Sequence, residues 1–93
     1  LIALPGGCGT FEELLEAITW KQLGIINKPI VILNTDGYYT PLIEMLEKAV
    51  REHFMREEHL CLWTVASTPE EALEQVENAP DWDADTAKFM ARI

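Results

Sequence analysis

The stretch Leu4–Leu14, LPGGCGTFEEL, joins an apolar run to a carboxylate-bearing helix through three glycines in four positions. Glycine N–H groups have no Cβ beside them, and at the start of a helix they lie at the positive end of its dipole. This combination favours binding of a phosphate group. A glycine-rich connection without a ligand is the alternative, and the residues alone leave it open. The pattern is not a Walker loop, because no Lys-Ser or Lys-Thr pair follows the last glycine.

Thr10 and Glu13 have the T-x-x-E spacing of a capping box, in which each side chain accepts from the other residue's backbone N–H. Thr68 and Glu71 repeat this spacing without preceding glycines, so the signature by itself predicts only a helix start. Glu12 and Glu13 diverge by about 100° around the helix axis. We therefore expect a single carboxylate, rather than a pair, to face any substrate bound at the glycines.

Strand-like and helical patterns alternate along the chain, which predicts an α/β fold. The expected strands are 1–5, 29–34 and 61–66, and the expected helices are about 10–23, 40–54 and 68–76. The first two strands are almost continuously apolar, as in a parallel sheet covered by helices on both faces. This order favours right-handed crossovers and a doubly wound sheet. A break is expected at 78–82, and 78–93 is expected to form a peripheral tail that includes a short helix.

The first expected helix carries apolar residues on two faces. One stripe, expected to pack on the sheet, consists of Phe11, Leu14, Leu15 and Ile18. Trp20 points roughly the opposite way, together with Glu13 and Glu16. It is either a single exposed side chain or a contact with a second subunit, since aromatic residues are enriched at interfaces. We favour the interface, because the chain is small for a self-sufficient α/β core.

The composition disfavours several classes of protein. Seven Lys and Arg against sixteen Asp and Glu give a formal charge of −9, which opposes binding to a nucleic-acid backbone. The sequence has no membrane-length apolar run and no signal-like segment, and its two cysteines are too few for a disulfide framework. We therefore expect a cytoplasmic setting without nucleic-acid or membrane partners. Leu1 lies inside a strand-like run, so the chain is expected to be a piece of a longer one.

Other candidate residues give weaker signals. Asp36 and Tyr39, in the DGYY stretch after a strand, are candidates for the border of a ligand cleft, although turn chemistry explains the Asp-Gly pair equally well. Cys8 is expected to be structural filler, because no histidine lies nearby in sequence to form a dyad. His53 and His59 are six residues apart without accompanying ligands, so no metal site is predicted.

Pro5–Glu13, PGGCGTFEE, resembles the P-G-G-x-G-T-x-x-E motif of the LOG ("lonely guy") family. Members are cytokinin riboside 5′-monophosphate phosphoribohydrolases, often mislabelled lysine decarboxylases. The stretch from Glu16 to Tyr39 is also similar to the family, and the resemblance spans roughly residues 1–66. It implies a Rossmann-like fold in which 1–93 is a single domain, the C-terminal part of the family's domain. The N-terminal portion, with an earlier glycine-rich turn and a catalytic Arg, is then missing.

The resemblance implies hydrolysis of the N-glycosidic bond of a nucleoside 5′-monophosphate, AMP or an N6-substituted AMP, to free base and ribose 5-phosphate. Mapped by motif position, the substrate phosphate contacts Gly6, Gly7, Gly9 and Thr10, and Glu13 is the catalytic carboxylate. The family is dimeric, which agrees with an outward Trp20, and no metal or cofactor is implied. The alternatives are a non-catalytic nucleotide or molybdenum-cofactor carrier with the same fold, and a purely structural dimer module.

Overall fold

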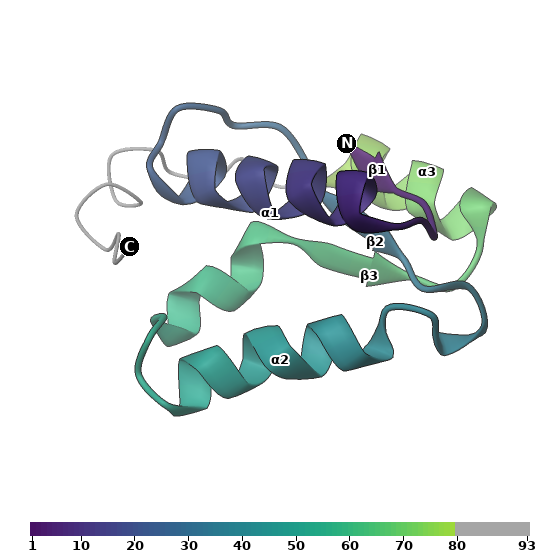
Figure 1. The fold of residues 1–93 in the computed structure, drawn as a ribbon. Helices are drawn as coiled ribbons and strands as arrows, with labels where there is room; N and C mark the ends of the chain where they lie inside the picture. The colour runs from purple at the N-terminus through teal and green to yellow at the C-terminus, as the bar shows by residue number, and fades with distance from the viewer. Residues whose placement is uncertain (80–93) are drawn as a thin grey trace.

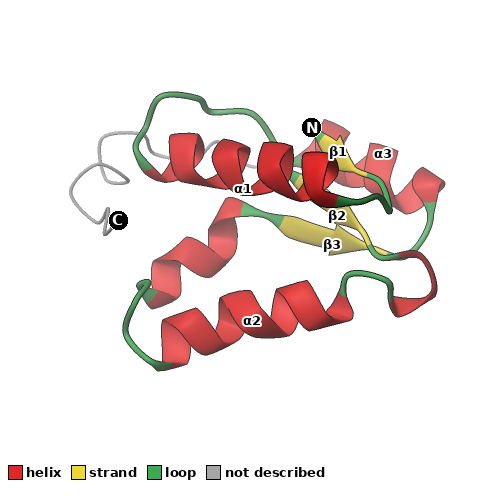
Figure 2. Ribbon diagram, viewed as in Figure 1, coloured by secondary structure: helices red, strands yellow, loops and turns green. Residues whose placement is uncertain are grey.

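The computed structural model describes residues 1–79, and it confirms the predicted α/β fold. Three strands form a parallel sheet in the order β1-β2-β3 (Figure 1, Figure 2): β1 (Ile2–Ala3), β2 (Val31–Leu33) and β3 (Thr64–Ala66). The α-helices are α1 (Cys8–Gln22), α2 (Thr40–Arg51) and α3 (Pro69–Asn78), and two 3₁₀ helices are η1 (Thr35–Gly37) and η2 (Glu57–Leu62). The predicted tail from residue 80 onward lies outside the described residues.

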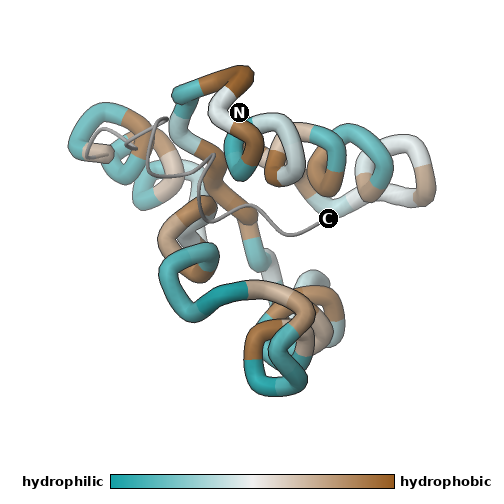
Figure 3. The backbone as a smooth tube through the Cα atoms, turned by 90° about the vertical axis from the view of Figure 1, so that its left-hand side faces the viewer, coloured by the Kyte–Doolittle hydropathy of each residue, from teal (hydrophilic) through white to brown (hydrophobic). Residues whose placement is uncertain are grey.

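Side chains of the central strand alternate between two apolar cores. Ile32 belongs to a core shared with α1 and α2, whereas Val31 and Leu33 pack with Ala66 of β3 and Ala72 of α3. Helices therefore cover both faces of the sheet, which explains why β2 is apolar at every position. In Figure 3 the central part of the chain is largely brown, and the surrounding helices carry teal turns.

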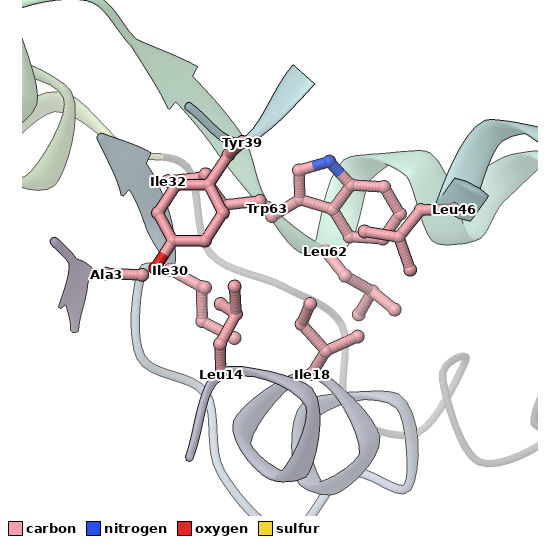
Figure 4. Close-up of a cluster of buried hydrophobic side chains, with 9 residues drawn as sticks. All are labelled: Ala3, Leu14, Ile18, Ile30, Ile32, Tyr39, Leu46, Leu62 and Trp63. Atoms are coloured by element: carbon pink, nitrogen blue, oxygen red, sulfur yellow. The ribbon is translucent and has the colours of Figure 1, made fainter. Parts of the chain in front are cut away.

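The larger core fixes the orientation of α1 against the sheet (Figure 4). It consists of Ala3, Leu14, Ile18, Ile30, Ile32, Tyr39, Leu46, Leu62 and Trp63. Leu14 and Ile18, four residues apart, point into this core, and Phe11 packs against it partly buried. The prediction that Leu15 joins this stripe is wrong, since it is an exposed side chain. It lies about 100° around the helix from Leu14, outside the face centred on Leu14 and Ile18.

Several element ends differ from the prediction, and two of them are displaced by three residues. Helix α2 ends at Arg51 instead of 54, because His53 adopts a left-handed conformation (φ 66°) and the Phe54 N–H donates to the Ala49 carbonyl at 2.9 Å. The third strand begins at Thr64 instead of 61, because the preceding residues form η2. Neither difference changes the connections that follow β1 and β2.

Candidate functional site

The glycine turn, Pro5–Gly9, leaves β1 and enters α1 without a side-chain cap. Gly7 is the N-cap residue, in an extended conformation, and its carbonyl accepts from the Phe11 N–H at 3.0 Å. The N–H groups of the first helical turn have no acceptor within the helix. A Cβ placed on Gly7 or Gly9 would meet nothing within 4 Å, so the space beside these amides is open. The turn therefore offers several backbone donors to an anion.

Gly6 differs from the other two glycines, because its neighbour Thr10 occupies the space where a Cβ would lie. A Cβ built on Gly6 would lie 2.4 Å from Thr10 Oγ1 and 3.0 Å from Thr10 Cβ. The first distance requires the Thr10 side chain to shift if Gly6 carries a Cβ, and the second is tighter than nearly all Cβ contacts. The Thr10 side chain thus lies directly over the turn.

The predicted capping box at Thr10 and Glu13 is wrong. Helix α1 begins at Cys8, which places Thr10 inside the first turn, and no side chain caps the helix. The second T-x-x-E does cap its helix, because the Glu71 N–H donates to Thr68 Oγ1 at 3.2 Å. The same four-residue signature therefore has two different roles. Glu13 has no capping role, and it is an exposed residue.

Thr10 and Glu13 line one pocket of about 190 Å³ between α1 and β1. Its other lining residues are Leu14 of α1 and the run Leu1–Leu4. Glu12 does not line it, as its divergence around the helix predicts. The structure thus places one carboxylate beside the threonine that follows the glycines.

The connection between β2 and α2 contacts the glycine turn from the neighbouring strand. Parallel strands end at the same edge of a sheet, so the connections after β1 and β2 lie side by side (Figure 1). The Tyr38 hydroxyl donates to the Gly6 carbonyl and the Tyr39 hydroxyl donates to the Leu4 carbonyl, each at 2.5 Å. Two long-range hydrogen bonds therefore hold the path of the turn.

Asp36 and Tyr39, the two residues predicted at the border of a cleft, have different surroundings. Asp36 is exposed and adopts a left-handed conformation (φ 52°), followed by Gly37 with φ 73°. Tyr39 is instead only 1% exposed, and its hydroxyl donates to the carbonyl of Leu4, the residue before the turn. Burial, and then the charge of Tyr38, raise the pKa of the Tyr39 hydroxyl. Tyr38 is the exposed tyrosine of the pair, and it was not among the residues predicted to border a cleft.

Trp20 is 44% exposed, as its position on the outward face of α1 predicted. It lines an apolar groove of about 370 Å³ with Glu13 and Glu16 from the same helix. The other groove residues are Leu1, Ala17, Ile26, Lys28 and Ile30. The catalytic candidate Glu13 therefore lies between the 190 Å³ pocket and this groove.

The remaining candidates are the histidines and cysteines, and they form no metal-binding cluster among the residues that the structure describes. His53 lines a separate cavity of about 840 Å³ between the end of α2 and η2, whereas His59 is buried. Cys8 and Cys61 are exposed free thiols. Among residues 1–79, no group of three or more His, Cys, Asp or Glu side chains is placed to hold a metal ion. In the same residues, every helix is too short or too polar to span a bilayer.

Residues 1–76, which include the glycine turn and the whole sheet, match the sequence model of the family described as "Possible lysine decarboxylase". The chain belongs to this family. A relative from Oryza sativa subsp. japonica, named "Probable cytokinin riboside 5′-monophosphate phosphoribohydrolase LOGL2", is 54% identical over 76 residues. That match covers 82% of this chain and 31% of the relative.

Two Arabidopsis thaliana proteins, named cytokinin riboside 5′-monophosphate phosphoribohydrolases LOG7 and LOG4, are also similar. The first is 47% identical over 90 residues, 96% of this chain and 42% of its own length. The second is 50% identical over 76 residues, 82% of this chain and 35% of its own length. The predicted resemblance to the LOG family is confirmed. The chain spans about a third of the length of these LOG relatives.

Proposed function

We propose that the protein containing this chain hydrolyses the N-glycosidic bond of a nucleoside 5′-monophosphate, with AMP or an N6-substituted AMP as substrate. The observation that supports this most is the position of Glu13, which shares a pocket with Thr10 one helical turn after the uncapped amides. The names of the LOG relatives supply the substrate class. The products are the free base and ribose 5-phosphate.

The glycine turn binds the 5′-phosphate in this proposal. Gly7 and Gly9 leave room for an anion beside their amides, and Thr10 adds a hydroxyl at the same turn. The formal charge of the chain is −9, so local backbone dipoles rather than a positive surface attract the phosphate. Such binding far from the reacting bond supplies energy for orienting the sugar.

Glu13 follows Gly9 by four residues, which is about 6 Å along the helix axis. This separation is comparable to that between the phosphorus and C1′ of a ribose 5-phosphate. The Glu13 carboxylate then faces the sugar while the phosphate occupies the turn. As the C1′–N bond breaks, positive charge develops on C1′ and the ring oxygen, and the carboxylate stabilises it. The carboxylate also orients or deprotonates the attacking water, which adds its hydroxyl to C1′ while the base leaves with a proton.

The apolar groove around Trp20 is the surface we propose for a second subunit. A half-exposed tryptophan beside Ile26 and Ile30 has the composition of an interface centre. Because Glu13 borders the same groove, a partner seated there closes one side of the catalytic pocket. The protein is then a homodimer with its active site near the interface.

The decisive experiment compares Glu13→Gln with Glu12→Gln in the full-length protein. Each change replaces one exposed carboxylate on the first two turns of α1 by its neutral isostere. We expect Glu13→Gln to lower kcat for AMP cleavage at least about a hundredfold, while nucleotide affinity changes little. Glu12→Gln should retain activity. Equal activity of wild type and Glu13→Gln rejects the catalytic assignment, and retention of uncleaved AMP by the wild type favours a carrier.

A further inference from the structure

The glycine turn has little intrinsic rigidity, because three of its five residues are glycine. Two side chains from a distant segment compensate for this. The hydroxyls of Tyr38 and Tyr39 bind the carbonyls of Gly6 and Leu4, respectively. These bonds join residues 32 and 35 positions apart in the sequence. The shape of the turn is therefore set by tertiary contacts.

The two bonds have different consequences for the amides. In a trans peptide the C=O and N–H groups point in opposite directions, and the described residues contain no cis peptide bond. Fixing the Gly6 carbonyl on Tyr38 therefore directs the Gly7 N–H to the opposite side of the peptide plane. The peptide that follows Leu4 belongs to Pro5, which has no N–H to direct. Only the Tyr38 bond thus orients a donor.

The Tyr38 ring is itself held by packing. It meets the buried ring of Tyr39 edge to face, with centroids 5.1 Å apart. Tyr39 meets Phe11 of α1 in the same manner at 6.1 Å, and its backbone N–H donates to Asn34 Oδ1 at 2.6 Å. The Asn34 side chain also donates to Thr40 Oγ1 at 3.1 Å. The connection that carries Tyr38 is therefore held in place by ring packing and hydrogen bonds.

We propose that Tyr38 is a positioning residue for the phosphate site, acting through the Gly6–Gly7 peptide. Its hydroxyl holds the peptide in the orientation that presents the Gly7 N–H to the anion. Donors fixed before binding cost no reorganisation when the ligand arrives. This inference rests on the proposed function, because it assumes that the glycine turn binds the substrate phosphate.

The test measures inorganic phosphate binding to the full-length protein by following the amide signals of Gly7 and Gly9 in NMR titrations. Tyr38→Phe removes the hydroxyl and keeps the ring, and we expect phosphate affinity to fall about threefold to tenfold. Tyr39→Phe is the matched control, because it also removes one hydroxyl-to-carbonyl bond of 2.5 Å. Phosphate affinity in this control should stay within about twofold of wild type. An unchanged affinity in Tyr38→Phe, or equal losses in both variants, overturns the inference.

Activity assays on the same proteins separate this inference from the proposed function. In an active enzyme, Tyr38→Phe should raise KM for AMP while kcat changes little. If the wild type binds phosphate at Gly7 but cleaves no nucleotide, the hydrolase proposal fails and the role of Tyr38 stands. Phosphate binding that leaves the Gly7 and Gly9 signals unmoved overturns both.

Discussion

The side chain of Thr10 lies over Gly6 so closely that a Cβ on Gly6 would be 2.4 Å from Thr10 Oγ1. The first glycine of the turn is therefore a packing requirement. Gly7 and Gly9, in contrast, have open space where a side chain would lie. The three glycines thus differ in their surroundings, and substitutions at Gly6 and Gly9 should have different effects.

Gly6→Ala should destabilise the protein by about 1–3 kcal/mol, the usual cost of forcing a methyl group into a filled site. Chemical denaturation measures the loss. The double variant Gly6→Ala with Thr10→Ala should recover part of it, because the Oγ1 contact is removed while the Cβ contact at 3.0 Å remains. Wild-type stability in Gly6→Ala would show that the Thr10 side chain moves aside freely.

Gly9→Ala should have the opposite effect on stability. Gly9 lies within α1, where alanine is favoured over glycine by up to about 1 kcal/mol, and its Cβ meets no neighbour. The added methyl instead occupies space beside the donors, so phosphate affinity should fall in an NMR titration. Thr19→Ala, in the last turn of α1, is the control that raises helix propensity without touching the glycine turn. Unimpaired phosphate binding by Gly9→Ala argues against an anion at these amides.

Trp20→Glu should shift a dimer of the full-length protein to monomers in sedimentation velocity. A charged side chain in an apolar groove must be desolvated when a partner covers it, which opposes association. Leu73→Glu is the matched control, because Leu73 is an exposed apolar residue on α3, which packs on the opposite face of the sheet. An identical sedimentation profile for wild type and Trp20→Glu contradicts the interface.

The Tyr39 hydroxyl predicts how stability depends on alkaline pH. Its pKa is raised in the folded protein, chiefly by burial, so the folded state retains this proton more strongly than the unfolded state. The resulting stability is fully present below the ordinary tyrosine pKa of about 10 and is lost as pH rises through the raised value. Unfolding free energies measured across this range should fall in the wild type and fall less steeply in Tyr39→Phe. Parallel curves for the two proteins refute the assignment to Tyr39.

The periodic features of the sequence predicted most of the fold. Continuous apolar strands and the inward positions of Leu14 and Ile18 depend on local spacing, and the structure agrees with both. The divergence of Glu12 and Glu13 around the helix also predicted that only one carboxylate faces the site, and Glu13 alone of the two lines the pocket with Thr10. Whether these residues bind and cleave a nucleotide stays a prediction.

Residues that depend on long-range contacts could not be predicted in the same way. The start of α1 was placed at Thr10, because T-x-x-E is a local signature that says nothing of the turn before it. The role of Tyr38 depends on the pairing of β1 with β2, which brings two connections together. One feature of the sequence could have indicated Tyr38. It follows β2 closely in the sequence, and the connection after one parallel strand lies near the connection after the adjacent strand.

The distance in sequence between the tyrosines and their acceptors separates the motif from the side chains that hold it. A nascent chain that ends after α1 contains every residue of the P-G-G-x-G-T-x-x-E motif but neither hydroxyl that shapes it. The bond to Gly6 joins residues 32 positions apart, and it requires the connection after β2 to lie beside the glycine turn. A fragment that stops before Tyr38 therefore carries the whole motif without the bond that holds the Gly6 carbonyl.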